Sequence, residues 1–311
     1  MSRPLRFIPK DGIVEVTTRT LQGRLLLKPS PKLNDLILGV VGRAQERYGM
    51  VIHAFVFMSN HCHFLVRPCD AQQLSKFMQF VNSNVAREAA RLHDWPEKFW
   101  SRRYRAIPVL DDETSFARIR YILSHGAKEG LVASSTAWPG ASCVEALTRG
   151  KLLRGTWINR SEEFNARARG EKVRPSDHQT IHDIQLTPLP VLAGRTPDQC
   201  QAEFRRLMQE IRTEAVAVNK ELGRTPIGAA KVLDQDPHHR PDSLDRSPAP
   251  FVHCKDRYQA IEFRFAYLAF VVGHCSATAH LHINAHQLTH VFPEGAFPPA
   301  LPFVRAVGTS A

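Results

Sequence analysis

The chain has 311 residues and a formal net charge of +11, from 41 Lys and Arg against 30 Asp and Glu. This length allows two domains, or one domain with a long extension, and a hydrophobic content of 43% is typical of a globular protein. Its apolar runs fall short of the ~20 residues that span a bilayer, and the first twelve residues lack the apolar core of a signal peptide, so we expect neither membrane insertion nor secretion. The six cysteines form no C-x-x-C pair, which argues against a disulfide framework and indicates a cytoplasmic protein.

The positive charge is concentrated in the first half of the chain. Residues 1–150 hold 21 Lys and Arg against 13 Asp and Glu, whereas residues 151–311 hold 20 against 17. Lys and Arg gain free energy when they release counterions from a phosphate backbone, so this surplus predicts a polyanionic partner. The alternative is a basic protein that its charge keeps soluble.

The first 130 residues alternate between short strand-like and longer helix-like segments. Strands are indicated by alternating apolar residues or by a hairpin at Ser59-Asn60, and helices by apolar residues at helical spacing after Ser-Pro or Asp caps. The order β-α-β-β-α-β-α predicts an α+β fold, a ferredoxin-like antiparallel sheet with helices on one face. The expected strands are 12–20, 51–58, 61–68 and 106–110, and the expected helices are 32–48, 70–91 and 114–125.

The later residues have a different texture. We predict a catalytic domain over 1–133, a polar and proline-bearing connecting region over 134–195, and a mainly helical accessory region over 196–311. Long helices are expected at 196–222 and 256–274. The accessory region could brace the first domain, bind flanking DNA or mediate dimers, and its residues do not choose among these roles.

Two histidines alternate with a cysteine in the second strand of the expected hairpin. His61 and His63 point to one face of that strand, while Cys62 points to the other and is expected to lie in the core rather than act as a nucleophile. Two adjacent imidazoles are well placed to hold a divalent cation. The alternative is a pair of exposed histidines without a ligand.

The last helix of the first domain carries Tyr121 and His125, four residues apart and therefore on one helix face. A helix beside the sheet could bring His125 to the cation as a third ligand and Tyr121 next to it. A tyrosine hydroxyl beside a metal-bound phosphate is suited to nucleophilic phosphoryl transfer, with a covalent phosphotyrosine as the intermediate. The alternative is a tyrosine that packs in the core.

Other polar clusters suggest further roles. The segment with Arg102, Arg103, Tyr104 and Arg105 predicts phosphate contacts from its arginines and base stacking from Tyr104; the alternative is a basic loop whose aromatics anchor it to the core. Arg118 and Arg120 are further candidates for contact with a DNA backbone. A second H-x-H at His280 and His282, continued by His286 and His290, is a candidate zinc site, although histidine enrichment of a polar tail explains it more simply.

Three motifs in order resemble those of the HUH (His-hydrophobic-His) single-tyrosine transposases, particularly the REP-associated branch. The first is MSNHCHFLV at 58–66, the second is FWSRRY at 99–104, and the third is YILSHG at 121–126, followed by GLV at 130–132. The chain departs from the family pattern at Ser59, where proline is usual, and at His125, where the family carries Asn or Gln as a further metal ligand. Because histidine is a competent ligand, this departure implies a retained site with a changed metal preference.

The resemblance implies a DNA strand transferase that cleaves and rejoins single-stranded or hairpin DNA through a covalent 5′-phosphotyrosine. His61 and His63 are then metal ligands, Tyr121 is the nucleophile, and the metal is Mg²⁺ or Mn²⁺, although histidine ligation alone equally admits Zn²⁺. Such a protein would be cytoplasmic and associated with the nucleoid, and the family includes both homodimers and monomers. The alternative function is a DNA-binding regulator that keeps the fold without cleaving.

Overall fold

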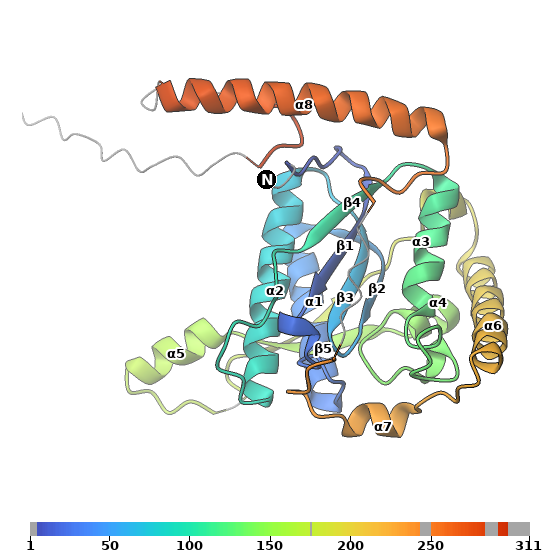
Figure 1. The fold of residues 1–311 in the computed structure, drawn as a ribbon. Helices are drawn as coiled ribbons and strands as arrows, with labels where there is room; N and C mark the ends of the chain where they lie inside the picture. Colours follow the sequence, from blue (N-terminus) through green and yellow to red (C-terminus); the bar gives the residue numbers. More distant parts are fainter. Residues whose placement is uncertain (1–4, 175, 243–249, 284–291, 298–311) are drawn as a thin grey trace, which may run out of the picture.

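A four-stranded antiparallel sheet forms the centre of the protein in a computed structural model that describes residues 5–174, 176–242, 250–283 and 292–297 (Figure 1). The strand order is β2-β3-β1-β4, which is the ferredoxin-like order that the sequence predicts. The strands are β1 (Ile13–Arg19), β2 (Val51–Phe57), β3 (His61–Arg67) and β4 (Arg105–Val109).

The register gives this sheet one apolar face and a second face, here called the polar face, on which polar side chains lie among apolar ones. Residues directly opposite on antiparallel strands point to the same side, so the pairs Val16–Phe64 and Val14–Val66 line the apolar face. The same register places Thr17 between His63 of β3 and Arg105 of β4, on the other face. A row of polar side chains therefore crosses the sheet on the face opposite to Phe64 and Val66.

Helices cover the two faces differently. α1 (Pro31–Tyr48) and α2 (Ala71–Leu92) pack on the apolar face, where Phe77 of α2 contacts Phe64 with a ring-centroid distance of 6.0 Å. This confirms the predicted antiparallel sheet, with α1 and α2 together on one face. α3 (Asp112–Ser124) lies against β2 and β3 on the opposite face, where it buries Ile119, Ile122 and Leu123 and brings Tyr121 beside His63.

The ends of α3 are fixed by its sequence. Asp111 accepts a hydrogen bond from the Thr114 backbone amide at 2.7 Å, which caps the first turn. The helix ends at Ser124, and His125 leaves the helical conformation with φ −56° and ψ 144°. Gly126 follows with φ +85°, a conformation that glycine adopts without strain. The helix thus ends within one residue of the predicted end at 125, and His125 marks the turn out of the helix.

Residues 134–195 contain more structure than a polar connecting region implies. They form α4 (Val144–Arg149), α5 (Arg160–Ala168) and a hairpin of β5 (Leu153–Ile158) and β6 (Gln179–Ile184), with short 3-10 turns η2 (Ser135–Ala137) and η3 (Pro190–Leu192). β5 packs directly on α1, at a point where Gly39 and Gly155 bring the two backbones together. The exposed side of this hairpin is polar, which is why its sequence resembles a connection.

The last part of the described chain is helical, as predicted. α6 (Pro197–Glu221) begins with a capping box at Thr196 and Gln199 and packs on α3, where Phe204 stacks on Phe116. α7 (Ala229–Asp234) is short, and α8 (Arg257–Ile283) is longer than expected and lies across one end of the sheet (Figure 1). Within the described residues, no helix has the length and apolarity to cross a membrane.

We expect Gly39→Ala to destabilise the protein, because a methyl group there would lie 2.1 Å from the Thr156 carbonyl carbon of β5. Overpacking of this kind costs about 1–3 kcal/mol, which urea unfolding followed by circular dichroism would measure. Gly273→Ala in α8 is the control, since its methyl group would meet nothing closer than 3.5 Å. Equal stability of the two variants would show that β5 does not pack on α1 as described.

Candidate functional site

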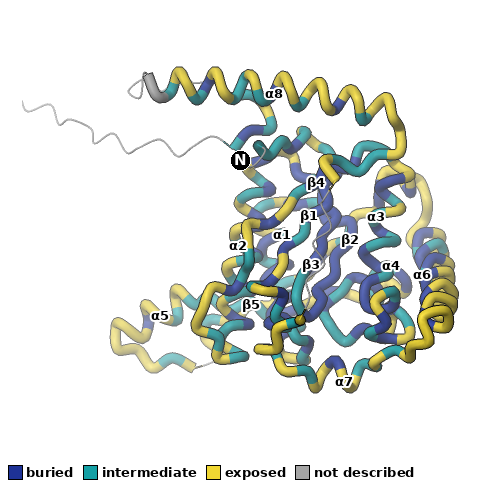
Figure 2. Tube along the Cα trace, viewed as in Figure 1, coloured by how far each residue is buried: buried dark blue, intermediate teal, exposed yellow. Residues whose placement is uncertain are grey.

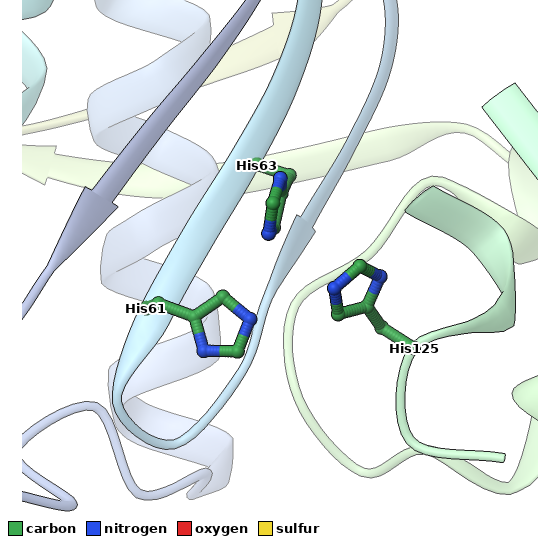
Figure 3. Close-up of side chains that lie close together, drawn as sticks. All are labelled: His61, His63 and His125. Carbon is green, nitrogen blue, oxygen red and sulfur yellow. The ribbon is translucent and has the colours of Figure 1, made fainter. Parts of the chain in front are cut away.

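Three histidines converge on the polar face of the sheet (Figure 3). His61 and His63 come from β3, and His125 comes from the residue that follows α3. Each ring offers one nitrogen, and these three nitrogens lie within 4.8 Å of one another. The ring centroids of His63 and His125 are 4.5 Å apart. The sequence-predicted ligands are thus brought together by two elements that are about sixty residues apart in the chain.

The second nitrogen of each ring is held by an oxygen acceptor. The Nδ1 atoms of His61, His63 and His125 lie 2.6 Å from Asn60 Oδ1, 3.0 Å from Glu15 Oε1 and 2.8 Å from the Tyr121 carbonyl oxygen, respectively. With Nδ1 donating its hydrogen, each neutral ring keeps its lone pair on Nε2. Metal-binding histidines in proteins are oriented in this way, so the donor set fits a divalent cation.

Glu15 organises the surroundings of His63. This carboxylate is 3% exposed and also accepts two hydrogen bonds from Arg118 of α3, at 2.6 and 3.0 Å. The Nε2 atom of His253, from the segment before α8, lies 2.9 Å from Glu15 Oε2. Burial opposes ionisation of Glu15, but its contacts with His253, His63 and Arg118 outweigh burial and hold the pKa of this carboxyl well below its usual range.

His61 and His125 are held in the neutral form. Burial is the main cause that lowers the pKa of both rings, and the neighbouring His63 lowers it further. A neutral imidazole is the form that coordinates a metal. The environment therefore keeps these ligand nitrogens available at neutral pH.

Tyr121 lies beside the histidine cluster. Its ring centroid is 4.7 Å from that of His125 and 5.6 Å from that of His63. Two cations face the ring, with the Arg118 guanidinium carbon 3.9 Å and the Lys128 Nζ 3.5 Å from its centroid. Burial raises the pKa of the Tyr121 hydroxyl, and the charge of Glu15 raises it further, so the hydroxyl is protonated at neutral pH.

One arginine of the predicted basic segment, Arg105, lies on the same face of the sheet as His63. Arg102, Arg103 and Arg105 are exposed. Within the described residues, none of the three forms an ion pair with an acidic residue. Arg105 shares a cross-strand row with His63, two strands away. Neighbouring strands are about 4.8 Å apart, which puts this row within about 10 Å of the histidines.

Three of the predicted DNA-contact residues have other partners. Tyr104 is only 6% exposed, and the Arg6 guanidinium carbon lies 4.0 Å from its ring centroid, so this ring has no free face for a base. Arg118 is engaged by Glu15, and Arg120 bonds to Glu210 and Glu214 of α6. These two arginines hold α3 in place between the sheet and α6, because an acidic residue distant in sequence lies opposite each of them.

Sequence reasoning missed Glu15, His253 and Lys128. Glu15 carried a usable signal, because it alternates with Thr17 and Arg19 on the polar side of the first strand. His253 and Lys128 have no local pattern that points to the site. The expectation for Cys62 is confirmed, since this side chain is fully buried and burial raises its pKa to about 12.

The second histidine cluster is largely beyond what the structure describes. His286 and His290 lie outside the described residues, and His280 is an exposed residue of α8. Across the described ranges, the group of His61, His63 and His125 is the convergent metal-ligating cluster.

Part of the chain matches a known protein family. Residues 30–125 match the family described as Transposase IS200 like, and this segment includes the three histidines and Tyr121. Over this segment, the match supports the resemblance to single-tyrosine transposases that the sequence predicts. A search among curated proteins found no match.

Two solved structures are similar to the chain. One is described as the REP-associated tyrosine transposase bound to a REP hairpin, with 18% identity, 48% of this chain and 87% of that chain covered, and a TM-score of 0.41. The other is a putative transposase from Deinococcus radiodurans R1, with 15% identity, coverage of 39% and 95%, and a TM-score of 0.28.

We expect Glu15→Gln to weaken metal binding by about 10–100-fold, because the acceptor that orients His63 loses its charge. Titration calorimetry with Mn²⁺ and Zn²⁺ would measure the dissociation constants. Glu97→Gln, a change at an exposed glutamate, is the matched control. An unchanged affinity in a folded Glu15→Gln protein would show that Glu15 does not support a metal site.

Proposed function

We propose that the protein is a transposase that cleaves and rejoins single-stranded or hairpin DNA through a covalent 5′-phosphotyrosine on Tyr121. The observation that carries this proposal is the position of Tyr121 beside three imidazoles that turn their free nitrogens toward one another. A nucleophile next to a cation site is the arrangement that phosphoryl transfer to a side chain requires.

The proposed reaction is a transesterification. The Tyr121 Oη attacks the phosphorus, the bond from phosphorus to the 3′ oxygen breaks, and the tyrosine proton ends on the departing 3′-hydroxyl. Rejoining is the reverse, with a 3′-hydroxyl attacking the phosphotyrosine. A divalent cation held by His61, His63 and His125 would neutralise and orient the phosphate during both steps.

The ligand set favours a transition metal over Mg²⁺. Three imidazole nitrogens suit Zn²⁺ and Mn²⁺ more than Mg²⁺, which prefers oxygen ligands and retains its water. The nearest buried carboxylate, Glu15, is engaged by Arg118 and His63 rather than free to bind a cation. We therefore propose Zn²⁺ or Mn²⁺ as the cofactor, which changes the order of preference expected from the sequence.

We infer that a DNA strand approaches the cluster over β1 and β4. α3 covers the half of the polar face formed by β2 and β3, whereas Thr17 and Arg105 lie on the half formed by β1 and β4 (Figure 1). Arg105 would supply positive charge on that half, and the exposed Arg102 and Arg103 would supply it from the loop before β4. A single strand that crosses it would reach Tyr121 with its phosphates neutralised along the way.

Tyr121→Phe is expected to abolish the covalent adduct with a labelled hairpin oligonucleotide, because it removes the attacking oxygen. Denaturing gel electrophoresis would detect the adduct, and Tyr104→Phe, the buried tyrosine of the basic segment, should still form it. An adduct formed by Tyr121→Phe would exclude Tyr121 as the nucleophile. A wild-type protein that binds the hairpin yet forms no adduct with Mn²⁺, Zn²⁺ or Mg²⁺ would instead support the non-cleaving DNA-binding protein.

The double change Arg102→Ala with Arg103→Ala is expected to weaken binding to single-stranded DNA and to flatten its salt dependence. Each lost phosphate contact should lower the slope of log affinity against log salt by about 0.7. Fluorescence anisotropy at several salt concentrations would measure both quantities. Arg212→Ala removes one positive charge from an exposed position of α6, outside this segment, and should leave the slope unchanged. Equal slopes for the wild type, this control and the double variant would contradict the proposed path.

A further inference from the structure

α8 presents two opposite faces that both follow a seven-residue repeat. Its inner face buries Phe263, Phe270 and Ala277, and Phe7 packs on the first two with ring-centroid distances of 5.4 and 4.8 Å. These contacts attach the helix to the body of the protein. The other face of α8 is exposed along most of its length (Figure 2).

Five large apolar side chains line this outer face. Their exposed fractions range from 37% to 80%, and together we call them the α8 stripe: Tyr258, Ile261, Phe265, Leu268 and Val272. Single exposed apolar residues are ordinary, but a continuous row of this kind marks an interaction surface. The inner face already packs on the body of the protein, and the contacts among the described residues give no reason for a second apolar face.

The spacing of the stripe is that of a coiled-coil seam. Successive members are three, four, three and four residues apart, which are the a and d positions of a heptad. Cys275 and Ala279, both exposed, occupy the next d and a positions. The seam therefore extends over about three heptads, or roughly 32 Å of helix.

The charged residues beside the seam indicate which partner binds it. In this register Arg257 is a g residue and Glu262 is an e residue, and both are exposed. In a parallel pair of identical helices, each g residue faces the e residue five positions further along the other helix. Arg257 would then face the partner's Glu262, and this contact would occur twice. An antiparallel pair sets g against g and e against e, so these opposite charges would not meet.

We propose that the α8 stripe binds the same stripe of a second copy of this chain, as a parallel two-helix coiled coil. The inner face holds α8 as a helix before association, so the dimer does not bear the cost of helix nucleation. This interface goes beyond the proposed DNA chemistry and does not depend on it: the Tyr121 adduct assay could fail while the dimer persists, and the reverse.

The first test is the oligomeric state of the full chain. Light scattering after size-exclusion chromatography should give the mass of a dimer, and the double change Phe265→Glu with Leu268→Glu should give a monomer with unchanged circular dichroism. Ala266→Glu places a charge on an exposed residue of α8 next to the stripe and should remain dimeric. A wild-type monomer at the highest attainable concentration, or a dimer of the double variant, would overturn the proposal.

The second test addresses orientation. Arg257→Glu should weaken the dimer about tenfold by placing like charges across the seam, and adding Glu262→Arg should restore it. Mild oxidation should also link the two Cys275 side chains of a parallel dimer, and Cys275→Ser should prevent the link. Loss of affinity without restoration, or a dimer that does not cross-link, would overturn the parallel arrangement.

Discussion

The buried carboxylate of Glu15 is the interaction on which the arrangement of the site depends. It brings together His63 of β3, Arg118 of α3 and His253 of the segment before α8. Burying a carboxylate costs several kcal/mol, and such a group is stable only when its partners stay in place. Glu15 therefore couples three distant parts of the chain, because the loss of any one partner would leave a buried charge undercompensated.

This coupling explains how a helix lies on the polar face of a sheet. α3 buries Ile119, Ile122 and Leu123, but its contact with β1 is made through the ion pair of Arg118 with Glu15. On its outer side, Arg120 joins the helix to α6. Held from both sides, α3 fixes the position of Tyr121 and of the turn that presents His125. Tyr121 is thus positioned by electrostatic contacts as much as by apolar packing.

The parts of the site that depend on local periodicity could be predicted from the sequence. His61 and His63 share a strand face, and Tyr121 and His125 are one helical turn apart, so their convergence followed once the β-α order was recognised. The sequence predicts DNA contacts for Arg118 and Arg120, because the residues around a charged side chain do not reveal its ion-pair partner. Their acidic partners lie about ninety to one hundred residues away in the chain. The hairpin of β5 and β6 was missed for a similar reason, since the approach of Gly155 to Gly39 is a long-range contact that no local pattern reveals.

The same geometry links the histidine cluster to α8. His253 contacts Glu15, its backbone amide donates to the Pro108 carbonyl of β4 at 2.9 Å, and Lys255 donates to the Asp111 carboxylate that caps α3. α8 begins two residues later, so the stripe and the site are joined by a short segment that is bonded at both ends. A second copy bound to α8 would hold this segment in place. It would thereby also hold His253, the residue of the accessory region that contacts Glu15. The accessory region is therefore more than a brace: it supplies one of the three contacts that keep the buried carboxylate ionised beside His63.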